Sequence, residues 1–239
     1  MTGGSRGLGL GIARELTQSG YRVVVVARKL NRTLASVMEK VARSRRGELQ
    51  FIPFDLSDID AIPALVQKIR ADFGPIYGLV NNAAMGTDGV LALMHTSHIE
   101  QLVRLNTVSP IVLTKYVVRS MLSEGGGRIV NIASIIGFTG YRGLSVYGAT
   151  KASMLGFTRS LAREVGRHGV NVNAVAPGFI ETDMTRALDD EQRGQVARRS
   201  ALRRLPEIED VANAEEFLLG DKAKNITGTV LTVDAGSTA

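Results

Sequence analysis

Short apolar runs alternate with longer amphipathic stretches from one end of the chain to the other, and this alternation constrains the fold most strongly. The apolar runs are bounded by turns and have the length of strands that are buried on both faces. They occupy residues 21–27, 49–53, 77–81, 127–133, 171–177 and 229–233. Strands that alternate with helices in this way predict an α/β fold, a doubly wound parallel sheet of the Rossmann type with helices on both faces.

The amphipathic stretches predict helices over residues 8–19, 30–45, 59–73, 96–122 and 148–166. The fourth of these contains Pro110, which removes a backbone donor and restricts Ser109. We therefore expect a kink or local irregularity near Asn106, where unpaired backbone groups need a partner or a bound water. Because no linker or repeat interrupts the pattern, residues 1–239 are expected to form a single domain.

The glycine-rich segment at residues 2–9 has the character of a turn that follows a strand, yet only Met1 precedes it. In a doubly wound sheet this first strand lies near the centre. We expect the first strand to be missing or truncated, which would leave two strand edges exposed. Residues upstream of Met1 would supply the strand, and a fold built without it is the less favoured alternative.

The composition limits the possible chemistry. The chain has no Cys and 3 His, which excludes disulfides and thiolate sites and argues against any metal site. With no apolar run long enough to span a membrane and no signal peptide, a cytoplasmic location is expected. The net charge of +6 favours acidic partners, such as an anionic cofactor, nucleic acid or an acidic carrier protein, although a solvated basic surface explains it equally well.

The glycine-rich turn reads Thr2-Gly3-Gly4-Ser5-Arg6-Gly7-Leu8-Gly9 and opens the first predicted helix. Glycines let the backbone approach a pyrophosphate, and free N–H groups at the helix N-terminus bind its charge. A flexible loop is the plainer interpretation of a lone glycine pattern. The strand that follows at βαβ distance favours dinucleotide binding by Gly3, Gly4, Ser5, Arg6, Gly7, Leu8 and Gly9.

The end of the strand at 21–27 distinguishes between the two nicotinamide cofactors. A site that prefers NAD places an acid there to hold the ribose 2′-hydroxyl, whereas an arginine accommodates the 2′-phosphate of NADP. This chain has Arg28 at that position, and Arg6 in the turn can converge on it. The sequence therefore favours NADP(H), unless both cations are simply solvated.

Further candidate residues follow the other strands, at the edge of the sheet where ligands bind in such folds. Asp55 and Leu56 suit contacts to an adenine, although a helix N-cap explains Asp55 equally well. The other candidates lie at or just after the ends of the predicted strands at 77–81 and 171–177. They are Asn82, Ala83, Ala84, Pro177, Gly178, Ile180 and Thr182.

Tyr147 and Lys151 are four residues apart, and on a helix this spacing places both side chains on one face. An ammonium group beside a phenol favours the phenolate, which lowers the pKa of the tyrosine. A phenol tuned in this way can donate a proton to a carbonyl oxygen. Ser134, just after the strand at 127–133, can hydrogen-bond a substrate carbonyl, although a single serine there is more commonly part of a turn.

Taken in order, the segments TGGSRGLG, NNAA, YGATK and PG, with Asn106 and Ser134, resemble the motif set of the short-chain dehydrogenase/reductase family. The resemblance covers essentially the whole chain, and residues 160–165 and 176–188 are most similar to the 3-oxoacyl-[acyl-carrier-protein] reductases of this family. It implies NADPH-dependent reduction of a 3-oxoacyl thioester, on acyl carrier protein or coenzyme A, in fatty acid synthesis. It also implies a homotetramer, with neither nucleic acid nor a membrane as a partner.

The resemblance implies roles for four residues. Tyr147 is the general acid, Lys151 lowers its pKa and contacts the nicotinamide ribose, and Ser134 polarises the carbonyl. Asn106 holds a water that connects Lys151 to solvent. The catalytic set is therefore Asn106, Ser134, Tyr147 and Lys151.

The chain departs from the family pattern at two places. Ala84 stands where glycine is usual, a small change that we expect cofactor binding to tolerate. Asp234-Ala235-Gly236 replaces the usual Asp/Asn-Gly-Gly near the C-terminus, and this is expected to alter a subunit contact.

Several functions remain open at the level of the sequence. One alternative is a short-chain reductase of another ketone or alcohol, whose choice of substrate would depend on residues 86–96 and a lid at 182–205. Others are a non-catalytic cofactor-binding protein and an inactive fragment. For an acidic carrier protein, the candidate docking residues are Arg128, Arg159, Arg167, Arg198, Arg199, Arg203 and Arg204.

Overall fold

In the part of the chain that the structure describes, six parallel strands form the centre of the protein. The computed structural model describes residues 1–44, 46–86, 89–180 and 190–239. Strand β1 pairs with β2, and the other four strands form a sheet in the order β3-β4-β5-β6, with every pairing parallel. The bounds are β1 (Arg22–Ala27), β2 (Glu48–Pro53), β3 (Gly78–Asn81), β4 (Gly127–Ile132), β5 (Val170–Pro177) and β6 (Val230–Val233).

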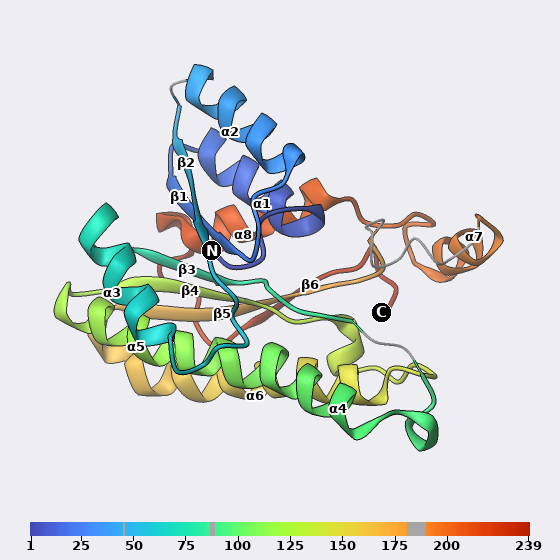
Figure 1. Cartoon of the computed structure of the whole chain (residues 1–239). Helices are drawn as coiled ribbons and strands as arrows, with labels where there is room; N and C mark the ends of the chain where they lie inside the picture. Colours follow the sequence, from blue (N-terminus) through green and yellow to red (C-terminus); the bar gives the residue numbers. More distant parts are fainter. Residues whose placement is uncertain (45, 87–88, 181–189) are drawn as a thin grey trace.

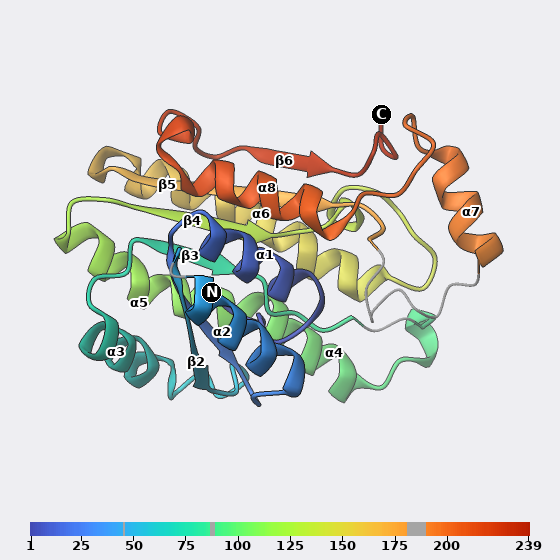
Figure 2. The same cartoon turned by 90° about the horizontal axis from the view of Figure 1, so that it is seen from above.

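Helices cover both faces of these strands, as the doubly wound fold requires (Figures 1 and 2). One apolar core lies under the helices of the first face and a second under those of the other. The first face carries α1 (Gly7–Gln18), α2 (Arg32–Ser44) and α8 (Ile208–Leu219). The other face carries α3 (Ile62–Phe73), α4 (Thr96–Val103), α5 (Ser109–Ser123) and α6 (Ser145–Val165). The predicted fold class is confirmed.

The first two residues lie in the centre of the sheet and join its two parts. Thr2 forms a parallel bridge with Val26 of β1, and its N–H donates to Val80 O of β3 at 3.0 Å. The N–H of Val26 in turn donates to Met1 O at 2.9 Å. Within the described residues, this bridge is the connection between β1 and β3.

The irregularity expected near Asn106 is present. Residues Arg104–Val108 form a π-helical turn between α4 and α5, and Asn106 lies buried within it. Pro110 follows at the start of α5, where the π-helical turn already interrupts the regular hydrogen-bond pattern of the helix. The wide turn lets two helices continue in nearly one direction while one polar side chain is turned inward.

Two helices, α6 and α8, differ from the prediction. Helix α6 begins at Ser145 rather than residue 148, so Tyr147 lies in its first turn. The predicted helices also omit α8, although Glu207 and Asp210 form a capping box at its start.

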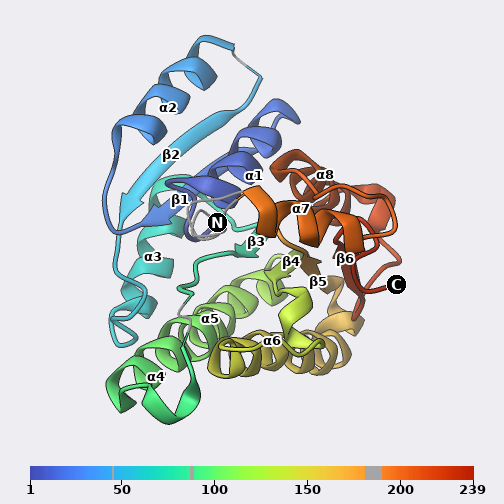
Figure 3. The same cartoon turned by 90° about the vertical axis from the view of Figure 1, so that its right-hand side faces the viewer.

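Helix α7 (Asp190–Arg199) falls within the expected lid and lies beyond the carboxyl ends of the strands (Figure 3). Among the described helices, none has the length and apolar character needed to cross a membrane.

Glu215 is an acid buried on the inner face of α8. It shares this face with Val211, Leu218 and Leu219 and is 0% exposed. Neither of its carboxylate oxygens has a hydrogen-bond partner among the described residues. Burial raises the pKa of Glu215 well above its ordinary value. Glu215 therefore opposes folding at neutral pH.

We expect Glu215→Met to raise the free energy of unfolding at neutral pH by about 1–3 kcal/mol, because it removes a buried polar group that lacks a partner. In the parent, the unfolded chain loses the proton of Glu215 above the ordinary pKa of a glutamate, while the folded protein keeps it. Parent stability should therefore fall as pH rises from there through the higher folded pKa, and the variant should lack this component. Urea titrations across pH measure it, and equal stabilities at neutral pH would contradict the prediction.

Candidate active site

The glycine-rich turn is held against the end of β3 by Thr2 and Asn82. Thr2 Oγ1 accepts hydrogen bonds from the N–H groups of Asn82 and Ala83, both at 3.0 Å. Asn82 Nδ2 donates to Thr2 O at 3.0 Å and to Gly3 O at 3.1 Å. Asn82 and Ala83 thus fix the shape of the turn. Thr2 is missing from the predicted site residues, although a threonine directly before two glycines is a usable signal.

Glycine is required at two positions of this turn. Gly3 has a φ of +69°, and a Cβ added there would lie 2.8 Å from Ala83 Cα. A Cβ on Gly9 would collide with Gly3 O and Asn82 Nδ2. The first turn of α1 can therefore pack directly on the glycine-rich loop only because both residues lack a side chain.

The N-terminus of α1 offers a place for an anion. Arg6 precedes the helix and makes no side-chain capping hydrogen bond, and the first turn contains no acidic residue. The free N–H groups at such a helix end carry partial positive charge. Together with the side-chain-free cradle at Gly3 and Gly9, this end of α1 fits the pyrophosphate of a dinucleotide.

Asn31 is a second residue that the predicted site omits. Its Nδ2 donates to Ser5 O at 2.9 Å, and its Oδ1 caps α2 by accepting from the N–H of Leu34 at 2.8 Å. Asn31 therefore ties the middle of the turn to the next helix. Its position just before an amphipathic stretch is the usual signal for an N-cap.

Arg28 follows β1 directly and is exposed, as is Arg6 in the turn. Asp55 lies just after β2, and its Oδ1 accepts from the Ser57 hydroxyl at 2.7 Å and from the Ser57 N–H at 2.9 Å. The side-chain hydrogen bond from Ser57 is the main reason that the pKa of Asp55 is lowered, and the charge of Arg28 adds to it. Asp55 closes a local turn, and Leu56 is buried in the apolar core.

Asn106 uses its side-chain amide to hold the segment that follows β3. Its Oδ1 accepts from the N–H of Met85 and its Nδ2 donates to Met85 O, both at 2.9 Å. Nδ2 also lies 3.2 Å from Thr150 Oγ1 on α6, and Thr150 donates to Tyr147 O at 2.8 Å. The π-helical turn is thereby linked to the backbone of the tyrosine.

Ser134 and Tyr147 meet beyond the end of β4. Ser134 Oγ accepts from the N–H of Ile136 at 3.2 Å and starts a short 3-10 turn over Ile135–Gly137. Burial raises the pKa of Tyr147, and a hydrogen bond with Ser134 lowers it by a smaller amount. The two hydroxyl groups are thus placed to contact the same substrate oxygen.

Lys151 lies below Tyr147 and is 4% exposed. Its Nζ donates to Ile132 O at 2.8 Å and is 5.8 Å from the centre of the Tyr147 ring. Burial lowers the pKa of Lys151 to about 8. The expected lowering of the Tyr147 pKa by Lys151 is not seen in the free protein, because burial of the phenol dominates and the amine is directed at the carbonyl of Ile132.

The loop after β5 closes the other side of the site. The N–H of Gly178 donates to Val233 O at 2.9 Å, and a Cβ on Gly178 would lie 2.7 Å from Asp234 Cβ. Pro177 and Ile180 are buried. Thr182 and the rest of 181–189, the first part of the expected lid, lie outside the described residues.

The departure near the C-terminus has a structural effect. Ala235 has a φ of 56°, a left-handed conformation that costs an alanine about 1–2 kcal/mol relative to glycine. The buried carboxylate of Asp234 holds this turn by accepting from the N–H of Gly236 at 2.9 Å and from the hydroxyl of Thr238 at 2.7 Å. The alanine is therefore accommodated without loss of the turn.

The structure divides the arginine candidates for docking. Arg128 is the second residue of β4, at the edge of the sheet opposite to Tyr147, and its side chain is 12% exposed and lies over the Tyr77 ring. Arg167 lies just past the far end of α6. Both are therefore remote from the site. The site lies at the carboxyl end of β4 and the N-terminal end of α6, whereas Arg128 lies at the start of β4 and Arg167 lies beyond the C-terminal end of α6. The exposed arginines that follow or end α7 are on the site's side of the sheet (Figure 1); they are Arg198, Arg199, Arg203 and Arg204.

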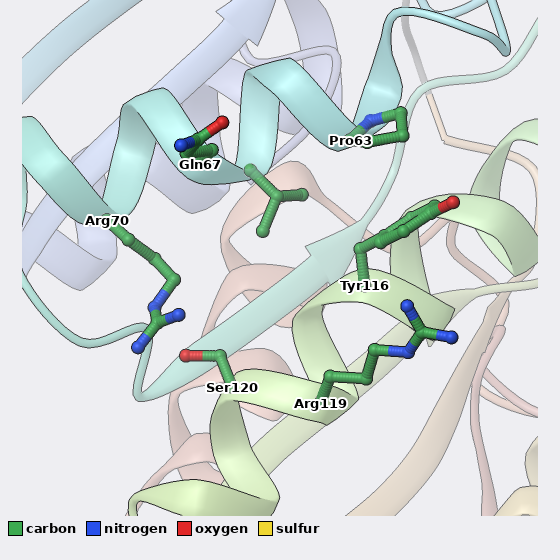
Figure 4. Close-up of a pocket in the computed structure, with 7 residues that line it drawn as sticks. Pro63, Gln67, Arg70, Tyr116, Arg119 and Ser120 are labelled. Carbon is green, nitrogen blue, oxygen red and sulfur yellow. The ribbon is translucent and has the colours of Figure 1, made fainter.

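A surface pocket of about 260 Å³ lies elsewhere, between α3 and α5 (Figure 4). The side chains of Arg70, Tyr116 and Arg119 line it (Figure 4), and Val66 is a further lining residue. None of the predicted site residues lines it. The predicted residues gather instead at the carboxyl ends of the strands.

A family model for short chain dehydrogenases matches residues 1–193. The chain is 39% identical to the 3-oxoacyl-[acyl-carrier-protein] reductase FabG of Escherichia coli over 236 residues, which cover 99% of this chain and 95% of that protein. The same-named protein of Staphylococcus aureus is 36% identical, with 99% and 96% of the two chains covered.

Solved structures agree with this assignment. A short chain dehydrogenase from Burkholderia cenocepacia in complex with NADP has a TM-score of 0.92 at 32% identity and covers 100% of this chain and 96% of its own. A short-chain dehydrogenase/reductase variant from Serratia marcescens also has a TM-score of 0.92, at 29% identity, with 100% and 96% of the chains covered. The protein is a member of the short-chain dehydrogenase/reductase family, and hence an oxidoreductase of the type that binds nicotinamide cofactors.

Proposed function

We propose that the protein reduces a 3-oxoacyl thioester to the 3-hydroxyacyl thioester with NADPH, on acyl carrier protein or coenzyme A, in fatty acid synthesis. The observation that carries this proposal is the convergence of Ser134, Tyr147 and Lys151 beside the glycine-rich turn. The relatives at 36–39% identity are named 3-oxoacyl-[acyl-carrier-protein] reductases, which supports the choice of substrate.

In this proposal the cofactor lies across the carboxyl ends of the strands. The uncapped N-terminus of α1 and the cradle at Gly3 and Gly9 hold the pyrophosphate. Arg28 and Arg6 bind the 2′-phosphate, which makes NADPH the preferred form. When bound, the cofactor supplies a hydride to the ketone carbon. The remaining proposed contacts are Gly4, Ser5, Gly7, Leu8, Asp55, Leu56, Asn82, Ala83, Ala84, Tyr147, Lys151, Pro177, Gly178, Ile180 and Thr182.

The side chains supply the proton. The ketone oxygen gains negative charge as its carbon receives the hydride, and the hydroxyl of Tyr147 gives its proton to that oxygen. Ser134 donates a second hydrogen bond to the same oxygen. Lys151, with a pKa of about 8, stabilises the phenolate that remains and can pass it a proton. One hydride and one proton convert the ketone to the alcohol.

Asn106 completes the proposed catalytic set. Because its amide holds Met85 and contacts Thr150, it fixes the π-helical turn next to α6. A bound water at this turn would link Lys151 to solvent and replace the proton lost in each cycle.

The proposed carrier protein is acidic, and it would dock on the arginines beside α7 rather than on Arg128 or Arg167, which lie at the far edge. The net charge of +6 supports attraction of such a partner. We further propose a homotetramer and a cytoplasmic location, as the resemblance implies.

The experiment that tests this function follows NADPH oxidation with acetoacetyl thioesters of acyl carrier protein and of coenzyme A, with NADH in parallel. Faster turnover of the carrier thioester with NADPH is the expected result. A protein that binds NADPH but reduces neither thioester would refute the substrate assignment, and a panel of simple cyclic ketones would then test for another reductase. Absence of both binding and turnover would favour a non-catalytic protein or an inactive fragment.

Tyr147→Phe should lower kcat by a factor of about 10² or more, because it removes the proton donor. NADPH affinity, measured by cofactor fluorescence, should change little. Tyr141→Phe is the matched control, since Tyr141 is an exposed residue of the nearby loop and is expected to be dispensable. Turnover of Tyr147→Phe at the parent rate would refute the general-acid assignment.

Arg28→Asp should move cofactor preference toward NADH, with the ratio of kcat/KM for NADPH over NADH falling by a factor of about 10–100. The expected cause is loss of a charge-assisted hydrogen bond to the 2′-phosphate. Arg43→Asp, at the other end of α2, makes the same change in charge and should leave the ratio unaltered. An unchanged ratio in Arg28→Asp would remove this residue from the phosphate site.

A further inference from the structure

A chain of buried hydrogen bonds crosses the protein beneath the proposed active site. Asn131 of β4 is at its centre, with Oδ1 accepting from Asn81 Nδ2 at 2.8 Å and Nδ2 donating to Thr158 Oγ1 at 2.9 Å. Asn81 of β3 also donates to Thr114 Oγ1 of α5 at 3.0 Å. All four residues are buried. The chain therefore ties α5 and α6 to two neighbouring strands, on the face of the sheet where these helices lie side by side (Figures 1 and 3).

This chain lies directly against the residues that hold Lys151. Asn131 precedes Ile132, whose carbonyl oxygen accepts the hydrogen bond from Lys151 Nζ. Thr158 is seven residues after Lys151 on α6, two turns along the same face and about 10 Å along the axis. Strand β4 and helix α6 are thus joined twice, through Lys151 at the carboxyl end of β4 and through Thr158 deeper in the sheet.

The bond between Asn131 and Thr158 has a fixed direction. Thr158 gives its hydroxyl proton to Met154 O at 2.7 Å, so its oxygen can only accept from Asn131. Asn131 must donate on this side and accept on the side of Asn81, and an amide is the group that does both. An isosteric valine at position 158 would leave Asn131 Nδ2 buried without this partner, and the spacing between β4 and α6 would then be set by apolar packing alone.

The other end of the chain reaches the glycine-rich turn. Asn81 is the last residue of β3, and Asn82 and Ala83 directly after it bind Thr2 Oγ1. The position of β3 relative to β4 therefore also sets the position of the turn relative to Lys151. Asn131 takes part in both connections, because it bonds to Asn81 of β3 and to Thr158 of α6.

We propose that Asn131 and Thr158 are positioning residues that set the place of Lys151 relative to Tyr147 and the cofactor turn. This rests on the proposed reductase function, in which Lys151 acts on the phenol. A buried amine with one hydrogen bond to Ile132 O has little freedom to compensate for a displaced helix, so a small shift of α6 changes the support that Tyr147 receives.

The test compares the parent with Thr158→Val and Thr158→Ser. Thr158→Val should lower kcat about tenfold and move the Tyr147-dependent limb of the pH–rate profile upward by about half a pH unit or more, because the phenolate loses support. NADPH affinity should stay within about twofold. Thr158→Ser keeps the accepting oxygen and should restore both values. Thr158→Ala replaces the valine variant should that variant fail to fold.

Asn171→Leu is the control for a purely structural effect. Asn171 is likewise a buried strand asparagine with two hydrogen bonds, to Lys224 O and Ile226 O, but it lies at the far end of β5. It should lower the unfolding midpoint and leave the pH profile unchanged. A Thr158→Val protein that loses stability yet keeps the parent kcat and pH profile would overturn the proposal.

A second readout does not depend on turnover. The tyrosinate absorbance that the NADP-bound parent gains over NADP-bound Tyr147→Phe on raising pH reports the pKa of Tyr147, and in the Thr158→Val background this pKa should be higher. A parent that reduces no ketone refutes the proposed function, whereas an unchanged Tyr147 pKa refutes the positioning role.

Discussion

The hydrogen bond from Lys151 Nζ to Ile132 O is the interaction on which the arrangement of the site depends. It fixes a buried amine at the carboxyl end of β4, where the strand has just ended and its last carbonyl oxygen is still free to accept. Tyr147 lies one helical turn before Lys151, and Ser134 follows Ile132 by two residues. One contact between a helix and a strand therefore brings together the three side chains of the proposed chemistry.

Burial makes this contact informative. An amine inside the protein has a pKa of about 8, and a phenol beside it has a raised pKa, since water is excluded from both. The free protein is thus not yet the phenolate-stabilising pair that the spacing of the two residues suggests. In the proposed reaction, the negative charge that develops on the substrate oxygen would change the balance, because it favours a protonated lysine.

A single residue, Thr2, connects the two parts of the sheet. Thr2 bridges β1 and β3 through its backbone, and its hydroxyl accepts from two N–H groups at the start of the Asn82 turn. The same residue therefore joins the two parts of the sheet and shapes the loop at the N-terminus of α1. Glu215 shows the opposite case, a buried acid whose oxygens have no partner within the described part of the chain and which offers no visible benefit to the fold.

Much of this could be predicted from the sequence. The β-branched runs and their spacing predict the parallel sheet, since period and length are local properties, and Pro110 predicts an irregular helix near Asn106. The start of α6 at Ser145 escaped prediction because helix ends depend on tertiary packing, and α8 was omitted although its capping box is a local signal. Thr2 and Asn31 each have a local signal, but their contacts with Asn82 and Ser5 join segments that are distant in sequence and could not be predicted.

By itself the sequence determined which residue types are available at the carboxyl ends of the strands, and the family to which such a set belongs. Only the tertiary structure decided which of them meet. In the structure, Lys151 donates to a backbone carbonyl, Asp55 accepts a hydrogen bond from Ser57, and the amide of Asn82 holds the glycine-rich turn. The structure also places Arg128 at the far edge of the sheet and joins Asn131 to Thr158. The reason is that each of these contacts depends on the packing of helices against strands, which no short stretch of sequence specifies.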